Sequence, residues 1–217
     1  MSEDIGLFDA LYSQRAIRYF KPDPVSDELI HKLIEAATKA PSGSNKQGWK
    51  FLVIRDQATK DIIGDYYKRG WEITWRKAIM WEAAYRGQSQ SSFFPVHARR
   101  SSEYLARHIA ESPVLIMACI DCIKHDGGPS PVFRGSSIYP AVQNLLLAAR
   151  GLGLGSCLTG LHKYYEDEVK ELLDIPENVE TAALLPVGFP ADNARYGPTR
   201  RAPVEEVTFR EKWDQAW

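Results

Sequence analysis

The sequence predicts an α+β fold, in which helices are layered against a β-sheet. Short apolar runs at 50–54, 114–120 and 182–187 are typical of buried strands. The segments 26–37 and 137–150 instead carry apolar residues at helical spacing. Strands and helices do not alternate in a strict βαβ order, which favours α+β over a parallel α/β arrangement.

The length and composition indicate an ordinary globular chain. Its 217 residues are enough for one compact domain spanning 1–217. A net charge of -1 disfavours a nucleic-acid partner, which would require a basic surplus. There is no run of 18 apolar residues for a membrane span, and the N-terminus lacks the basic region of a signal peptide. Three cysteines fit a reducing compartment. We therefore expect a cytoplasmic protein with no membrane and no nucleic-acid partner.

The N-terminal part contains two predicted helices separated by an extended segment. Apolar residues at helical spacing predict a helix over 5–14, and the alternating pattern of 15–20 predicts an extended chain. Pro22 and Pro24 exclude a helix directly after it. Ser26 is a favourable N-cap for the next helix, with two acids in its first turn.

Region 58–110 is predicted to be helical and is rich in aromatic residues. A helix is expected over 58–86, followed by a polar loop at 87–100 and a second short helix capped by Ser101. Aromatics that flank a polar loop indicate a flap over a pocket or a subunit contact. The alternative interpretation is a helical hairpin packed on the core.

The second half contains a helix that is apolar nearly all round. Such a helix, here at 137–150, is buried either in the core or in an oligomer interface. The glycines of 151–155 are predicted to end it, and a further helix is expected at 164–173. The tail at 204–217 ends in Phe209, Trp213 and Trp217, so we expect it to dock on a partner subunit.

The short motifs point to no metal or side-chain catalytic site. Cys119 and Cys122 form a C-x-x-C without a second pair, and in a strand they would point to opposite faces. Gly151 to Gly155 follows a helix, whereas a dinucleotide loop follows a strand. We interpret the cysteines as small buried hydrophobes and predict no metal site.

Two pairs of arginines remain as candidate anion ligands. Arg15 and Arg18 flank an extended segment, and Arg200 and Arg201 are adjacent near the other end. The planar guanidinium suits a phosphate group, although composition alone favours the interpretation of each as a solvated surface charge.

Taken together, four segments resemble the FMN-dependent nitroreductase family. The segment 15–25 resembles R-R-S-I-R-x-F followed by P-x-P-V, and 40–49 resembles A-P-S-G-x-N-x-Q-P-W. The segment 141–157 resembles the family's long central helix and its exit, and 185–206 resembles P-V-G-x-P followed by R-x-P-L-E-E. The order of all four is far more specific than any one of them.

The resemblance implies an α/β/α sandwich with a central, mainly antiparallel sheet, which assembles as an intertwined homodimer. FMN sites lie at the dimer interface, and each takes groups from both subunits. NAD(P)H then reduces the FMN, and the oxidant is a nitroaromatic, a quinone or an activated alkene. Because the redox chemistry belongs to the cofactor, no catalytic side chain is required. The aromatic flap at 58–110 would select the oxidant.

Eleven flavin-site residues follow from the match. Arg15 and Ala16 would lie along the phosphate and ribityl side, and Arg18 near the pyrimidine edge. Arg200 and Arg201 would contribute to phosphate binding. A loop from the other subunit would reach the flavin with Pro41, Ser42 and Ser44. The last three candidates belong to a backbone segment that would face the flavin near N5, namely Leu158, Thr159 and Gly160.

Two departures from the family pattern bear on flavin binding. Gln14 occupies the place of the first arginine of the family's pair, so phosphate binding would depend more on the other arginines. Gly48 occupies the place of a proline, which affects the rigidity of the loop.

Two alternative functions stay open. The same resemblance covers a flavin-fragmenting oxygenase and reductive dehalogenases of iodotyrosine type, which grip their substrate with an acid, a tyrosine and a lysine. Those residue types occur here without the matching spacing, at Asp65, Tyr66, Tyr67, Lys68 and Glu72. The second alternative is a non-catalytic flavin-binding or regulatory protein.

Overall fold

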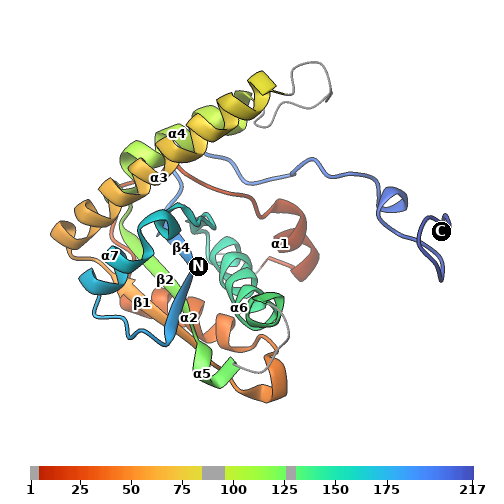
Figure 1. Ribbon diagram of the computed structural model, residues 1–217, viewed down its shortest axis with the longest axis horizontal. Coiled ribbons are helices and arrows are strands. Elements are labelled where there is room, and N and C mark those ends of the chain that lie inside the picture. The colour runs from red at the N-terminus through yellow and green to blue at the C-terminus, as the bar shows by residue number, and fades with distance from the viewer. Residues whose placement is uncertain (1–4, 85–95, 126–130) are drawn as a thin grey trace.

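A computed structural model describes residues 5–84, 96–125 and 131–217 of the chain. It confirms the α+β sandwich, with helices on both faces of a four-stranded sheet (Figure 1). The strand order is β1-β2-β4-β3, and the three neighbouring pairs are antiparallel. The sheet is open. Its strands are β1 (Trp49–Ile54), β2 (Val114–Asp121), β3 (Gly155–Ser156) and β4 (Val179–Gly188).

Helices α2 (Asp27–Thr38) and α6 (Pro131–Gly151) cover one face of the sheet. Alternate side chains of β2, such as Ile116 and Ala118, point into this layer, as a strand with two buried faces requires. The Ser26 side chain accepts a hydrogen bond from the Leu29 amide at 3.3 Å, which confirms the predicted N-cap.

The opposite face is covered by α3 (Gln57–Ala84), α4 (Val96–His108) and α7 (Glu166–Leu172). The intervening residues of β2, Leu115, Met117 and Cys119, point into this second layer. Strand β2 is therefore buried on both sides, which explains why its sequence is continuously apolar. Figure 1 shows α3 and α4 side by side as a long pair that extends beyond the sheet.

Several predicted boundaries differ from the structure. Helix α4 begins at Val96, so Ser101 lies inside it rather than at its cap. Helix α6 begins at Pro131 and contains Pro140, and the predicted start at 137 is therefore too late. Strand β1 is only partly buried, because it lies at the edge of the sheet and leaves Val53 40% exposed. The loop expected at 87–100 is wrong for 96–100, which belong to α4, and the rest of it lies outside the described residues.

The two cysteines of the C-x-x-C lie in different elements. Cys119 is a buried strand residue, whereas Cys122 begins the short helix α5 (Cys122–His125). Strand β2 ends at Asp121 and Cys122 is only partly buried, so the interpretation as a small buried hydrophobe is confirmed for Cys119 alone. Burial raises the pKa of the Cys119 thiol to about 12, so this side chain stays a neutral thiol at physiological pH.

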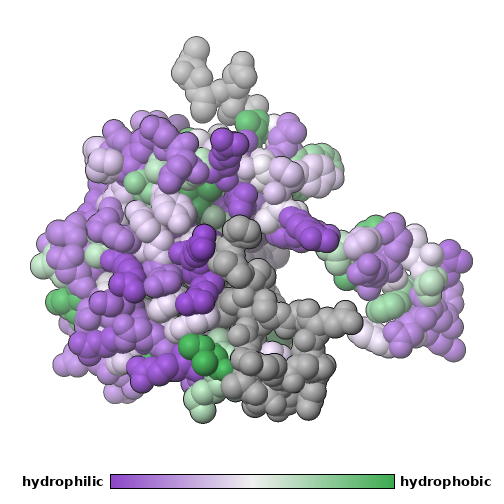
Figure 2. All heavy atoms as spheres, turned by 90° about the horizontal axis from the view of Figure 1, so that it is seen from above, coloured by the Kyte–Doolittle hydropathy of each residue, from purple (hydrophilic) through white to green (hydrophobic). Residues whose placement is uncertain are grey.

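The two ends of the chain carry exposed apolar residues. Helix α1 (Leu7–Ser13) exposes four large apolar side chains: Leu7, Phe8, Leu11 and Tyr12. The tail runs from the end of β4 away from the sheet, and Figure 2 shows its end as a separate group of atoms beside the body. Trp213 and Trp217 are 82% and 74% exposed there.

Four 3-10 turns complete the described chain, at Gly43–Asn45, Ile109–Glu111, Leu161–Tyr165 and Val204–Glu206. Within the described residues, no helix is both long enough and apolar enough to cross a lipid bilayer.

Candidate flavin site

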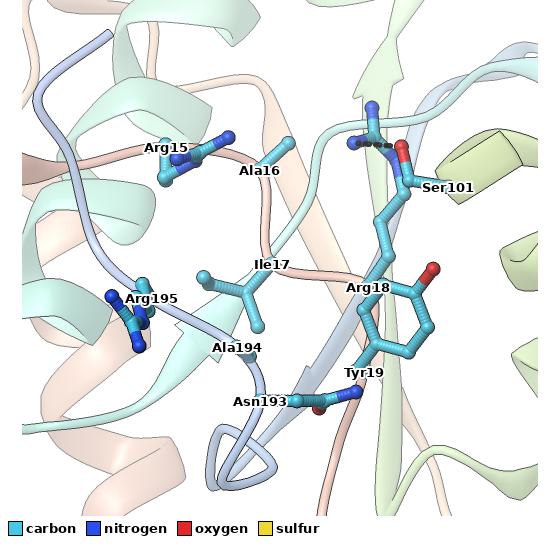
Figure 3. Close-up of a pocket in the computed structure, with 9 residues that line it drawn as sticks. All are labelled: Arg15, Ala16, Ile17, Arg18, Tyr19, Ser101, Asn193, Ala194 and Arg195. Atoms are coloured by element: carbon cyan, nitrogen blue, oxygen red, sulfur yellow. Dashed lines mark hydrogen bonds between the residues drawn. The ribbon is translucent and has the colours of Figure 1, made fainter. Parts of the chain in front are cut away.

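A pocket of about 270 Å³ opens where the extended segment after α1 crosses the chain that leaves β4 (Figure 3). It is lined by three groups of residues, from the N-terminal segment (Arg15, Ala16, Ile17, Arg18, Tyr19), from α4 (Ser101) and from the segment after β4 (Asn193, Ala194, Arg195). Three of the predicted flavin-site residues, Arg15, Ala16 and Arg18, thus meet in one pocket.

Close backbone contact with β3 holds the N-terminal segment in place. The Ile17 amide donates to the Ser156 carbonyl at 3.0 Å, which continues the pattern of the sheet by one bond. A Cβ atom on Gly155 would stand 2.6 Å from the Ile17 side chain. Only glycine allows this approach, so the glycine-rich exit of α6 positions the segment that carries the arginines.

The Arg18 side chain lies between α4 and the chain that follows β3. Its guanidinium donates to the Ser101 hydroxyl at 3.3 Å, shown by the dashed line in Figure 3, and also lies beside the Cys157 thiol. Burial raises the pKa of Cys157, while the neighbouring cation opposes that shift. Burial likewise raises the pKa of Tyr67, which stays a neutral phenol. Among the residues that the structure describes, Arg18 forms no ion pair, and its neighbours Ser101, Cys157 and Tyr67 are neutral.

The lining of the pocket carries a net positive charge. It contains three guanidiniums, and none of its nine lining residues is acidic. In Figure 3, Arg15 and Arg195 lie at one end of the pocket and Arg18 at the other. Such a donor set suits a ligand that carries a phosphate at one end and develops negative charge at the other. FMN has both properties, so the residues present fit this cofactor.

The predicted loop at Pro41, Ser42 and Ser44 does not line this pocket. It is held against α6, where the Ser137 hydroxyl accepts from the Gly43 amide at 3.2 Å. Ser44 adopts a left-handed conformation with φ of 52°, and the Ser42 hydroxyl accepts from the Gln47 amide at 3.0 Å. These hydrogen bonds hold the loop against α6, on a part of the subunit away from the pocket.

The other predicted residues lie beside the pocket or beyond it. Thr159 is buried, and its hydroxyl donates to the Leu184 carbonyl at 3.0 Å, while Leu158 and Gly160 on either side are exposed. Arg200 and Arg201 are exposed residues that precede the tail at 204–217, and they do not line the pocket. The structure thus brings together three of the eleven predicted residues in the pocket itself.

A buried polar network lies directly after Gly160. His162 is fully buried, and its Nε2 lies 3.1 Å from the Thr181 hydroxyl, which in turn donates to Glu166 at 2.8 Å. Lys163 pairs with the same carboxylate. Burial lowers the pKa of His162 to about 4, helped by the Lys163 cation, so the imidazole is neutral near pH 7. The network anchors the chain that follows Thr159 to β4.

Sequence reasoning missed four lining residues that offer polar side chains: Tyr19, Ser101, Asn193 and Arg195. Tyr19 had a local signal, because it belongs to the same motif as Arg18. Its ring stacks on Tyr104 of α4 with 4.2 Å between centroids, and Tyr104 stacks on His108. Ser101 and Arg195 had none, because only the packing of α4 and of the segment after β4 brings them here.

The nitroreductase family model matches residues 11–189, which is most of the chain. The chain belongs to the nitroreductase family. As a family member it is a flavin-linked oxidoreductase. The matched range includes the N-terminal segment and the whole sheet.

Individual family members resemble the chain over nearly its full length. It is 29% identical over 205 residues to a protein of Archaeoglobus fulgidus that is provisionally named an NADH dehydrogenase/NAD(P)H nitroreductase, covering 94% of this chain and 96% of that protein. It is 27% identical to the iodotyrosine deiodinase of Thermotoga neapolitana, with 94% and 96% covered. A protein described as a nitroreductase from Desulfovibrio desulfuricans, solved in complex with FMN, superimposes with a TM-score of 0.69 at 25% identity, covering 97% and 99% of the two chains.

Proposed function

We propose that this nitroreductase-family protein uses FMN to transfer a hydride from NAD(P)H to a nitroaromatic, a quinone or an activated alkene. The observation that carries the proposal is the pocket with three guanidiniums and no acid, built on the motif that the family uses for its flavin. Bound FMN would supply the redox chemistry, accepting the hydride and passing it on in a ping-pong cycle. The protein residues bind and orient the reactants and tune the charge around them.

Each end of the pocket has its own role in this proposal. Arg15 and Ala16 bind the phosphate and ribityl side, and Arg201, with help from Arg200, closes over the phosphate from the segment that precedes the tail. Arg18 lies at the pyrimidine edge, where a fixed cation stabilises negative charge on a reduced ring. The backbone of Thr159 and Gly160 faces the flavin near N5, with Leu158 beside it.

A homodimer would complete the site. The loop at Pro41, Ser42 and Ser44 lies away from the pocket of its own subunit, so it serves the site of a second subunit. The apolar face of α1 and the exposed tail at 204–217 offer surface for such an assembly. We further propose that the whole chain acts as a single FMN-binding domain, with 58–110 as its substrate-selecting flap.

The deciding experiment is an absorbance spectrum of the purified protein, recorded before and after anaerobic addition of NADH or NADPH. We expect a flavin spectrum that bleaches with at least one nucleotide. A flavin that is present but does not bleach would favour a non-catalytic flavin-binding protein or another electron donor. A colourless protein that cannot take up FMN would contradict the proposal.

Reductive dehalogenation is the second candidate, and the similarity to the deiodinase of Thermotoga neapolitana favours it. Of the residues that could grip an amino acid, Tyr67 is only 2% exposed, Asp65 pairs with Arg69 at 2.6 Å, and the Tyr66 ring stacks on Tyr165. These three side chains are engaged within the protein. Release of iodide from iodotyrosine under reducing conditions, without reduction of nitroaromatics, would establish this candidate instead.

A further inference from the structure

The segment after β4 runs antiparallel to the segment that carries Arg15 and Arg18. Backbone bonds join the two near both ends: the Ala191 amide donates to the Tyr19 carbonyl at 3.0 Å, and the Gly197 amide to the Ser13 carbonyl at 2.6 Å. Arg195 follows a turn that is closed by the Ala194 amide on the Ala191 carbonyl at 2.8 Å, and it precedes the bond at Gly197. The backbone is therefore fixed on both sides of Arg195, and Figure 3 shows this residue at the same end of the pocket as Arg15.

Two features hold this crossing tightly. A Cβ atom on Gly197 would stand 2.7 Å from the Tyr12 carbonyl oxygen, so only glycine permits the close approach. Arg150 of α6 clamps both segments, because it donates to the Ser13 hydroxyl at 2.7 Å and stacks over the Tyr196 ring at 4.0 Å. The close approach at Gly197 and the contacts of Arg150 both lie next to Arg195, and the Arg195 guanidinium takes part in neither.

The guanidiniums of Arg15 and Arg195 have no counter-ion among the described residues. Within the described part of the chain, neither forms an ion pair or a side-chain hydrogen bond, whereas Arg55 and Arg69 are each paired with an aspartate. Both side chains are exposed to solvent, which screens the repulsion between their charges, and an anion bound between them would offset it further. Each guanidinium is a planar fork of N–H donors, a group that suits the terminal oxygens of a phosphate monoester.

We propose that Arg195 is a phosphate ligand of this protein and, with Arg15, forms a clamp that distinguishes FMN from riboflavin. The inference rests on the proposed function and extends it to a residue outside the family motif. It also accounts for Gln14, which lacks the charge of the arginine that the family has at that place: Arg195 restores the second cation from the other side of the crossing. Arg15 and Arg195 belong to the same subunit, so the clamp does not require Arg200 and Arg201.

The test compares the affinities of the flavin-free protein for FMN and for riboflavin by flavin fluorescence. We expect Arg195→Ala to raise the Kd for FMN by about tenfold or more, because charge-assisted hydrogen bonds are lost. The Kd for riboflavin, which has no phosphate, should change by no more than about twofold. Arg195→Lys, which keeps the charge but loses the fork, should fall between wild type and Arg195→Ala. Inorganic phosphate should compete with FMN in wild type and less in Arg195→Ala.

Arg76→Ala is the matched control, since Arg76 is an exposed arginine of α3 outside the pocket. An Arg195→Ala protein that keeps the wild-type ratio of FMN to riboflavin affinity would overturn the inference. So would equal losses of both affinities, which indicate damage to the fold. A wild-type protein that binds both flavins equally well would overturn the clamp and leave the proposed function standing. A wild-type protein that binds neither flavin would overturn both.

Discussion

At the scale of single residues, His162 shows how burial alters the acid response of the fold. Its pKa is lowered from 6.5 to about 4, so between these pH values the unfolded chain binds a proton that the folded protein does not. Stability should therefore fall as the pH drops from 6.5 to 4, by up to about 3 kcal/mol from this group. We expect His162→Gln to be less stable at pH 7 but to lose less on acidification. Urea unfolding at several pH values in this range would measure the free energy of unfolding of wild type and of His162→Gln. Parallel plots of this free energy against pH would show that His162 is not the group responsible.

The hydrogen bond between Arg18 and Ser101 leads to a second residue-level prediction. Loss of this hydrogen bond, worth about 0.5–1.5 kcal/mol net, should lower the two-electron potential of bound flavin in Ser101→Ala by at most about 30 mV. The cation would then stabilise the reduced ring less well. Ser102→Ala is the control, because that hydroxyl donates to the Arg99 carbonyl at 2.9 Å instead. Spectroelectrochemistry measures the potentials, and equal values for Ser101→Ala and wild type would argue against a positioning role.

At the scale of elements, the fit between the N-terminal segment and β3 depends on the missing side chain of Gly155. Alanine there would force Ile17 away and destabilise the protein by about 1–3 kcal/mol. Gly151→Ala is the matched control, since a Cβ at Gly151 meets nothing within 4 Å. Denaturant unfolding should separate the two variants. Equal stabilities would show that the segment moves without cost, and the structural argument for the pocket would fail.

The sequence predicts an element correctly where a cap, an acidic first turn or a continuous apolar run lies within the element itself. Ser26 with its acidic first turn defines the start of α2, and the continuous apolar run of β2 defines a strand buried on both faces. A cap at Ser101 predicts a helix from 102, six residues after the actual start of α4 at Val96, so this good cap residue lies inside the helix. A capping residue is only a local preference, and packing against α3 overrides it.

At the scale of the whole molecule, the exposed apolar face of α1 predicts association. Phe8 is 65% exposed beside Leu7, Leu11 and Tyr12, an arrangement that costs free energy in water unless another surface covers it. We expect wild type to be a dimer by light scattering and Phe8→Asp to shift it toward monomer with weaker FMN binding. Ile62→Asp, at an exposed apolar position of α3, is the control. A monomeric wild type that binds FMN fully would contradict the shared site.

The sequence by itself determined the fold class, the family and two arginines of the pocket. These depend on signals contained in short segments: apolar periodicity, caps, and the motif around Arg15 and Arg18. Only the tertiary structure decided which other polar groups meet them. Arg195 and Ser101 come from distant parts of the chain, and the close backbone approaches at Gly155 and Gly197 decide where the crossing lies. No local pattern contains that information, because long-range packing selects which surfaces touch.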